Sequence, residues 1–363
     1  MLIFINVFLF FSYIYEDSDS LLVVNDSLVI CGYHQYNRKV HLVNNAKLKV
    51  QQWNGIDSTG RVILQAPFIY IHNSMIDGSG KGYSGGTNTH PDGYGPGCGY
   101  AGTGGGGGGG AYGGAGGDGG DLDPGAGGSP YGNLSDTVIN MGSGGGAGRL
   151  GLVDGFGGNG GALIYLKGQR MIIDSSQILS LGLYGYDGGY EAGGGGSGGG
   201  IKMQADTLRI RYSSVLASGG AGGNADGGGG GGGGGGRIKG FFAILDTNHL
   251  SLSVSGGAGG YGGYGNGENG STGTVFFGPL VVVEEKIVDN SLKAKVQSLI
   301  TKGRLNIFFK KNPDKILIYN IMGRLVKIGE NTENEIDVSD LKNGVYFLKL
   351  PGEKKLMKFI LIK

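Results

Sequence analysis

The sequence predicts an all-β protein: a right-handed parallel β-helix with long glycine-rich inserts, followed by a small C-terminal β-sandwich. All but eight of the 84 glycines lie between Gly78 and Gly278, and apolar segments of nearly constant length interrupt them. A flexible glycine linker needs no such regular interruptions, whereas stacked strands joined by glycine-rich excursions do. Near Glu284 the composition changes and the glycine-rich repeats stop, which indicates a second domain.

The chain begins with an apolar stretch from Leu2 to Tyr15. Its length suits the core of a signal peptide and is too short for a transmembrane helix, so residues 1–16 are expected to be a signal peptide. No basic residue precedes the stretch, and no small-x-small cleavage site is evident before Asp17. A truncated or misassigned start of the chain would explain both missing features. The alternative is a buried first strand. No later segment reaches the length of a membrane span.

Residues 17–283 are expected to form the β-helix, because three of their segments align without a gap. Within each half of the unit the apolar residues fall at every second position, which is the strand period. A polar step such as Gln169 to Arg170 marks a corner between two strands. The alignment superposes Leu64 on Leu166 and Met203, Ile69 on Met171 and Leu208, Ile71 on Ile173 and Ile210, Ser74 on Ser176 and Ser213, and Ile76 on Ile178 and Val215.

Repeat units are predicted near residues 61–80, 163–182, 200–220 and 237–257, with a degenerate copy at 41–51. The first two clear copies start 102 residues apart and the next two 37 apart, so the strands vary little while the inserts vary greatly. Stacked coils that share one core behave in this way, with insertions leaving from one corner.

The glycine-rich inserts contain few charged residues, which favours packed segments over a solvated chain. Runs such as 104–110 and 227–236 suit extended, polyproline-II-like segments in close contact, since no side chains keep the backbones apart. Flexible loops are the alternative. If the inserts are packed, their tyrosines are the expected anchors: Tyr83, Tyr94, Tyr100, Tyr112, Tyr131, Tyr184, Tyr186, Tyr190, Tyr261 and Tyr264.

A charged linker is expected at residues 284–295, before a domain at 296–363. From Lys286 onward 16 Lys and Arg face 8 Asp and Glu, whereas the preceding chain carries a net negative charge. Strands are expected at 315–319, 345–350 and 356–362, with glycine turns at Gly323 and Gly344.

This tail resembles the type A C-terminal sorting domain of bacterial type IX secretion cargo over about the last 60 residues. A Pro-Asn-Pro motif usually opens that domain, and here there is only Asn312-Pro313. The resemblance implies export to the cell surface or beyond, with the secretion machinery as partner and association with the outer membrane. An unrelated small β domain is the alternative. The resembling residues are Ile318, Tyr319, Asn320, Gly323, Arg324, Val326, Leu341, Gly344, Val345 and Tyr346.

The predicted coils offer few candidate catalytic residues. Asp77, Asp174 and Asp206 are candidate outward carboxylates, but they occupy different repeat positions and are not expected to converge. His72, Arg170 and Arg211 are interpreted as equally scattered. Neither a cofactor nor a catalytic site is expected.

Three further features of the sequence bear on ligands and partners. Cys31 and Cys98 form a disulfide or stay as two thiols, and they are too few for a zinc site. The stretch 116–123 (GGDGGDLD) resembles a calcium-binding nonapeptide, but it occurs once and such sites need stacked turns, so no metal is expected. No basic stripe with interleaved aromatic residues lies on the predicted coils, which excludes nucleic acid as an expected partner.

Two functional hypotheses remain. The favoured one is a non-catalytic extracellular or cell-surface protein, acting in architecture or adhesion and contacting a glycan or a protein through glycine and tyrosine surfaces. The alternative is an extracellular carbohydrate-active β-helix enzyme, either a polysaccharide lyase or a hydrolase.

Overall fold

The computed structural model describes residues 12–134, 137–150, 152–279, 294–301, 304–309, 315–320, 323–329, 335–342, 344–349 and 356–361. The chain divides into two compact units, Met1–Leu280 and Val281–Lys363. Every regular element among the described residues is a β-strand. The prediction of an all-β protein is therefore confirmed.

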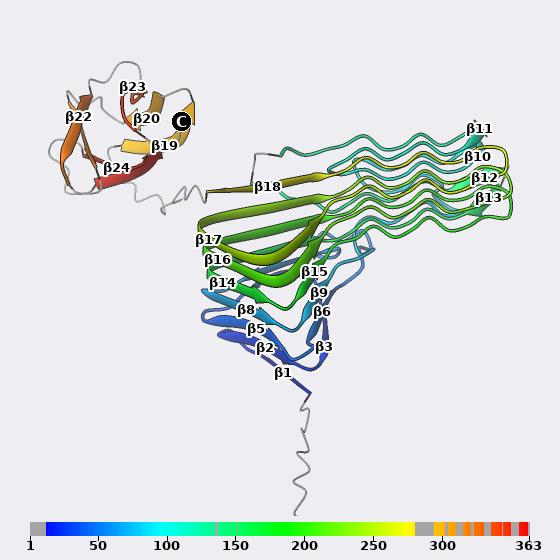
Figure 1. The fold of residues 1–363 in the computed structure, drawn as a ribbon, viewed down its shortest axis with the longest axis horizontal. Coiled ribbons are helices and arrows are strands. Elements are labelled where there is room, and N and C mark those ends of the chain that lie inside the picture. Colours follow the sequence, from blue (N-terminus) through cyan, green and yellow to red (C-terminus); the bar gives the residue numbers. More distant parts are fainter. Residues whose placement is uncertain are drawn as a thin grey trace, which may run out of the picture. The chain divides into compact units, whose positions relative to one another are not determined.

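The first unit consists of parallel strands that the chain visits in a repeating order, so that equivalent strands of successive coils lie side by side in three stacks (Figure 1). Strand β1 (Tyr13–Glu16) pairs antiparallel with β2 at the start. The first stack holds β2 (Ser20–Val24), β5 (Lys39–Val43), β8 (Phe68–His72), the end of β14 (Leu163–Asp174) and the middle parts of β16 (Gly200–Leu216) and β17 (Arg237–Ser253).

The second stack holds β3 (Ser27–Ile30), β6 (Lys47–Val50), β9 (Met75–Asp77), β15 (Gln177–Leu179) and the ends of β16 and β17. The third holds β4 (Gly32–Gln35), β7 (Arg61–Gln65), the starts of β14, β16 and β17, and β18 (Thr274–Pro279).

The pairing registers match the alignment predicted from the sequence. Ile173 lies in register between Ile71 and Ile210, and all three are 0% exposed. Ile178 lies in the same way between Ile76 and Val215. The degenerate copy at 41–51 is also a coil, which β5 and β6 form. The coil before it, which β2, β3 and β4 form, was not predicted.

One corner of the coils repeats an unusual backbone conformation. After the first stack, the equivalent residue of each of six coils has a positive φ between 46° and 56°. L-residues rarely adopt this left-handed region, and asparagine tolerates it better than most. The six corner residues are Asn25, Asn44, Asn73, Ser175, Tyr212 and His249.

The aligned serines form a hydrogen-bonded ladder next to this corner. The Ser176 hydroxyl accepts from the backbone N–H of Ser74 at 3.2 Å and donates to the carbonyl of Asp174 at 2.7 Å. The Ser213 hydroxyl does the same for Ser176, at 3.1 Å, and for the Arg211 carbonyl, at 2.6 Å. These buried hydroxyls satisfy backbone groups where strand pairing is interrupted.

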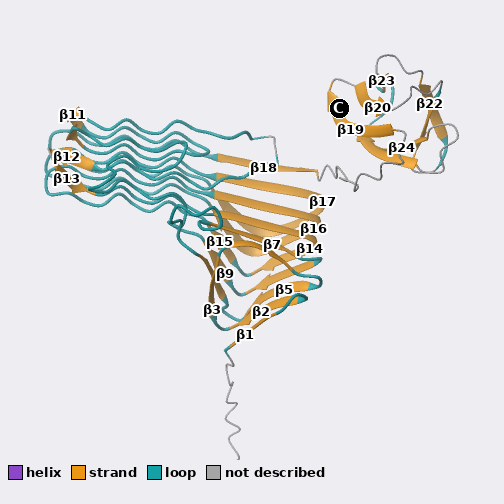
Figure 2. Ribbon diagram, turned by 180° about the vertical axis from the view of Figure 1, so that it is seen from behind, coloured by secondary structure: helices purple, strands orange, loops and turns teal. Residues whose placement is uncertain are grey.

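Every glycine-rich segment leaves from the end of the second stack and returns to the third. Residues 78–162, 181–199, 218–236 and 254–273 run outward and back beside one another, and together we call them the glycine layer (Figure 2). The runs 105–112, 192–200 and 227–236 are buried throughout. The structure therefore has packed segments, as favoured from the composition.

The hydrogen bonds of the glycine layer rotate among three neighbours with a period of three residues. The N–H groups of Gly231 and Gly234 donate to Gly107 and Gly110, while those of the next residues, Gly232 and Gly235, donate to Glu268 and Ser271. Gly233 and Gly236 donate to a third neighbour, at Gly220 and Ala217. Three residues per turn is the repeat of a polyproline-II helix, so each segment bonds chains on three sides.

The N-terminal segment is described only in part. Residues 1–11 lie outside the described residues, so most of the expected signal peptide does too. Its described end forms β1, whose four residues are exposed and thus not a buried strand.

The second unit contains two antiparallel sheets. One consists of β19 (Ala294–Thr301), β20 (Arg304–Phe309) and β23 (Glu335–Asp337). The other consists of β22 (Leu325–Gly329), β21 (Ile316–Asn320), β24 (Gly344–Lys349) and β25 (Leu356–Leu361). Strands β21, β24 and β25 cover nearly the same residues as the three strands expected from the sequence.

Candidate functional site

The three candidate carboxylates lie apart in the fold. Asp77 ends β9 in the second stack, Asp174 ends β14 in the first, and Asp206 lies where the third stack passes into the first. They do not converge, as the sequence predicted.

The interpretation of His72, Arg170 and Arg211 as scattered is wrong for His72 and Arg211, whereas Arg170 does lie at a different register position. His72, Asp174 and Arg211 occupy one register position on successive coils. His72 Nδ1 lies 3.2 Å from Asp174 Oδ2, and the Arg170 guanidinium lies over the Phe68 ring at 5.9 Å. Their shared position in the alignment was the available signal, and it was missed because the three side chains differ in chemistry.

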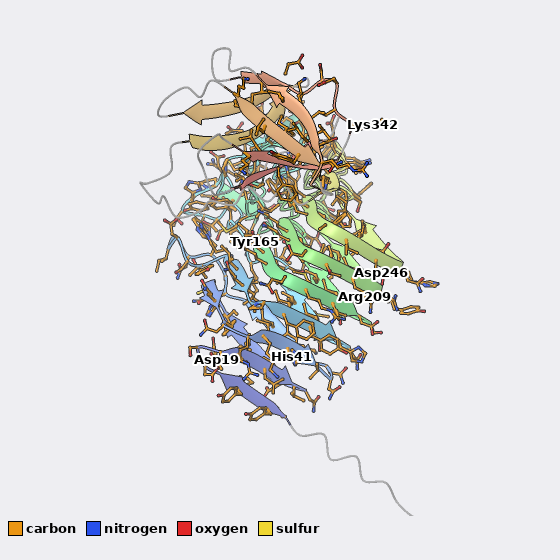
Figure 3. The ribbon with its side chains drawn as sticks, turned by 90° about the vertical axis from the view of Figure 1, so that its left-hand side faces the viewer. Asp19, His41, Tyr165, Arg209, Asp246 and Lys342 are labelled. Atoms are coloured by element: carbon orange, nitrogen blue, oxygen red, sulfur yellow. The ribbon has the colours of Figure 1, made fainter. Side chains whose placement is uncertain are left out.

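The next coil completes a charged row. Arg209 Nε and Arg211 Nη2 each lie 2.8 Å from Asp246 Oδ2. Figure 3 shows Asp246 and Arg209 on neighbouring strands of the same outer face. Hydrogen bonds from Arg211 and Arg209 hold the pKa of Asp246 below its usual value. This carboxylate is thus engaged in pairing adjacent coils, which is a structural role.

The cysteines are two free thiols in the structure. Cys31 Sγ donates to Gln51 Oε1 at 3.1 Å. Burial raises the pKa of the Cys98 thiol. A thiol that is held protonated is a poor nucleophile and a poor metal ligand.

The described part of the chain has no group of three or more His, Cys, Asp or Glu side chains placed to hold a metal ion. In the calcium-like stretch, Asp118 Oδ1 accepts a hydrogen bond from the Gly127 N–H at 2.7 Å. Asp121 and Asp123 belong to β11 (Asp121–Asp123).

The tyrosines of the glycine layer divide into two groups. Four are anchors, as expected. The Tyr112 and Tyr131 rings lie 4.9 Å apart and pack with Met141, and the rings of Tyr83 and Tyr94 lie 5.1 Å and 5.3 Å from that of Trp53. The expectation is wrong for six others, which are 40% exposed or more because they extend from the surface of the layer: Tyr100, Tyr184, Tyr186, Tyr190, Tyr261 and Tyr264.

The far end of the glycine layer is a set of stacked turns. A small sheet of β10 (Gly104–Gly105), β11, β12 (Gly148–Leu150) and β13 (Leu152–Gly155) lies at this end, away from the strand stacks (Figure 1). The Glu191 N–H donates to Asp154 Oδ2 of β13 at 2.9 Å, which holds the turn at 186–191 against this sheet. We call residues 121–124, 148–150, 152–155, 186–191, 224–228 and 261–266 the distal surface.

Side chains hold these turns at the 37-residue spacing of the coils. Asp187 Oδ1 accepts from the Asn224 N–H at 2.7 Å, and Asn224 Oδ1 accepts from the Tyr261 N–H at 2.8 Å. The Tyr190 and Tyr264 rings lie 6.0 Å apart. Gly227 lies against the Tyr190 ring, and a Cβ there would collide with it.

One carboxyl group of the distal surface is buried. Glu191 is 0% exposed, and its Oε2 accepts from the Gly228 N–H at 2.9 Å while its Oε1 has no hydrogen-bond partner. Burial raises the pKa of Glu191, and the neighbouring Asp121 and Asp154 raise it further. The local field at this end is therefore negative.

Large apolar side chains are exposed here as well. Leu122 is 90% exposed and Leu152 83%, while Tyr264 and Tyr261 are 72% and 66% exposed. The sequence alone did not single out this surface, because its residues are spread over six turns.

In the second unit, the residues that carry the sorting-domain resemblance lie on the strands β21, β22 and β24 and in their connections. Ile318, Leu341 and Tyr346 are buried. Gly323 has φ +74° in a turn where the Arg324 N–H donates to Asn320 Oδ1 at 3.0 Å. The side chain of Val345 lies outside the described residues.

Residues 301–363 match the family model of the secretion system C-terminal sorting domain. No curated protein and no solved structure matches the chain significantly. The sorting domain supports a secreted, surface-exported protein and implies interaction with the type IX secretion machinery. All ten resembling residues lie within the match, and their individual roles in sorting stay predictions. Among the described residues no helix has the length and apolarity to cross a membrane.

Proposed function

We propose that this exported chain is a non-catalytic binding protein of the adhesion type. In this proposal residues 17–283 form a right-handed parallel β-helix, residues 1–16 a signal peptide, and residues 296–363 a β-sandwich that attaches the chain to the outer membrane or releases it from there. The glycine layer holds the distal surface away from the strand stacks, where it is free to meet a partner.

The observation that carries the proposal is the exposure of large aromatic and aliphatic side chains on a hydrogen-bonded, glycine-packed support. Exposed apolar clusters cost solubility, and on soluble proteins they mark interaction sites. Because the turns are held by their own hydrogen bonds, little conformational entropy is lost when a partner binds.

The charged pairs of the strand stacks favour a non-catalytic role. Glycoside hydrolysis needs two carboxyl groups facing each other across a bond, at about 5 to 10 Å. Asp246 is paired with two arginines and Asp174 lies beside His72. Both arrangements link neighbouring coils.

Export and binding are tested separately. Deleting residues 298–363 is expected to abolish surface delivery in a host with the matching secretion system, as measured by cell fractionation. Unchanged delivery would remove the sorting role. The purified full chain is expected to bind whole cells or extracellular matrix and to leave polysaccharides intact. Polysaccharide cleavage would favour the enzyme alternative.

A further inference from the structure

The distal surface is strongly acidic. Its turns carry one basic residue, Arg149, and six acidic residues: Asp121, Asp123, Asp154, Asp187, Glu191 and Asp226. Within the described part of the chain, none of the ion pairs includes these carboxylates. Several accept hydrogen bonds from backbone N–H groups, which position a carboxylate without neutralising its charge.

Glu191 supplies an independent sign that this end lacks a positive counterpart. Its Oε1 is buried and has no hydrogen-bond partner. A buried oxygen without a partner costs stability, and a positive charge nearby would offset part of this cost.

The aromatic side chains lie beside the acidic ones. Tyr190 and Tyr264 form a ring pair next to the turn that contains Asp226, and Tyr261 follows Asn224 in the hydrogen-bonded ladder. Tyrosine faces attract lysine and arginine side chains through cation–π contacts, while carboxylates pair with their charged ends. Leu122, between Asp121 and Asp123 in the chain, and Leu152 on β13 add exposed apolar area to the distal surface.

From this arrangement we propose that the distal surface docks a basic protein, binding its lysine and arginine side chains between the exposed tyrosines and the carboxylates. This inference rests on the proposed binding function and adds the surface and the partner class. A neutral glycan would use the tyrosines but gain nothing from the five carboxylates that are accessible to solvent, all of them Asp, and charge complementarity therefore favours a cationic protein.

The test uses the full chain and three probes: poly-L-lysine, poly-L-glutamate of matched length, and neutral dextran. Binding is expected for poly-L-lysine alone, and it weakens as salt rises because the charges are exposed. The distal pair Asp123→Asn and Asp226→Asn is expected to weaken it at least about tenfold, equivalent to about 1.4 kcal/mol. Both residues are exposed and neither change alters side-chain volume appreciably.

A matched control separates a specific surface from general charge attraction. Asp57→Asn with Asp206→Asn removes the same charge from exposed positions outside the glycine layer. This control is expected to change affinity less than about twofold. A second distal variant, Tyr261→Ser with Tyr264→Ser, leaves the charge unchanged and is expected to weaken binding, whereas Tyr33→Ser on β4 is not.

Equal effects of the distal and control pairs would overturn the proposal, as would dextran binding without poly-L-lysine binding. If the full chain binds cells and the distal variants bind equally well, the adhesion function stands and this surface is wrong. If the full chain binds neither cells nor matrix, the proposed function itself fails. Thermal unfolding of each variant checks that the fold is retained.

Discussion

At the scale of single residues, the corner after the first stack shows how one backbone conformation is repeated with different side chains. Asn occupies it in three coils, and Ser175, Tyr212 and His249 occupy it in the other three. A left-handed conformation costs about 1–2 kcal/mol for most L-residues and less for asparagine. The later coils therefore carry local strain that the strand pairing on both sides compensates.

Replacing Ser175 with Asn should relieve part of this strain. The side chain of Ser175 is exposed, so the expected result is a gain in the free energy of unfolding of roughly 0.5 kcal/mol, measured by chemical denaturation. Gln177→Asn on the adjacent strand β15 is the control and should lower stability, because asparagine is disfavoured in strands. Destabilisation by Ser175→Asn would contradict the strain argument.

Glu191 predicts a pH dependence of stability. Its pKa is raised in the folded chain, so the folded state binds the proton more tightly than the unfolded state does. This contribution is fully present at pH values below the unfolded pKa of about 4.3 and is lost as the pH rises through the folded pKa. Glu191→Gln should remove the decline, so the variant gains stability relative to the wild type as the pH rises.

The measurement is the difference in free energy of unfolding between wild type and Glu191→Gln from about pH 4 to pH 8. Other carboxylates, such as Asp246, cancel in this difference. A difference that is independent of pH would show that the Glu191 carboxyl is not perturbed.

At the scale of elements, the strand stacks were predictable and the glycine layer was only partly so. Apolar residues such as Ile71, Ile173 and Ile210 indicate the register, because each must face the core and each takes the same position in its repeat unit. Glycine has no side chain to mark a face, so its hydrogen-bond partners cannot be derived from the sequence. Composition indicated close packing, and the partners came from the structure.

The same reasoning explains what the site prediction missed. The row of His72, Asp174 and Arg211 was visible in the alignment, because the three residues share one aligned position. It was missed because their side chains are of different chemical types. The exposure of Tyr261 and Tyr264 was not visible, since a tyrosine among glycines suits both an anchor and a surface contact. Only the layer's geometry distinguishes these two roles.

Gly233 tests whether the layer is packed on every side. A Cβ on Gly233 would overlap the carbonyl oxygen of Gly196, which is backbone and cannot move without shifting a neighbouring chain. Gly233→Ala should therefore lower the free energy of unfolding by more than about 2 kcal/mol. In Gly189→Ala the nearest atom lies 3.6 Å away, so that control should stay within about 0.5 kcal/mol. Equal tolerance at both sites would mean that the layer is loose.

At the scale of the whole molecule, the two parts of the chain differ in charge and in composition. The glycine-rich excursions leave from one corner of the stacks and bring acidic turns together at one end, while the segment from Lys286 onward is basic and contains the sorting domain. The glycine layer carries the acidic turns away from the strand stacks. It extends the chain using backbone hydrogen bonds alone, so its surface residues are free to vary without loss of the scaffold.

The central claim is that the glycine layer is a rigid, hydrogen-bonded scaffold and not a set of flexible loops. Hydrogen exchange measured by mass spectrometry on the full chain tests it most directly, because each buried glycine N–H in the run 229–236 has a backbone acceptor. The account predicts strong protection across 229–236, comparable to that of the strand β16. Complete exchange of these amides within the dead time, with β16 still protected, would contradict it.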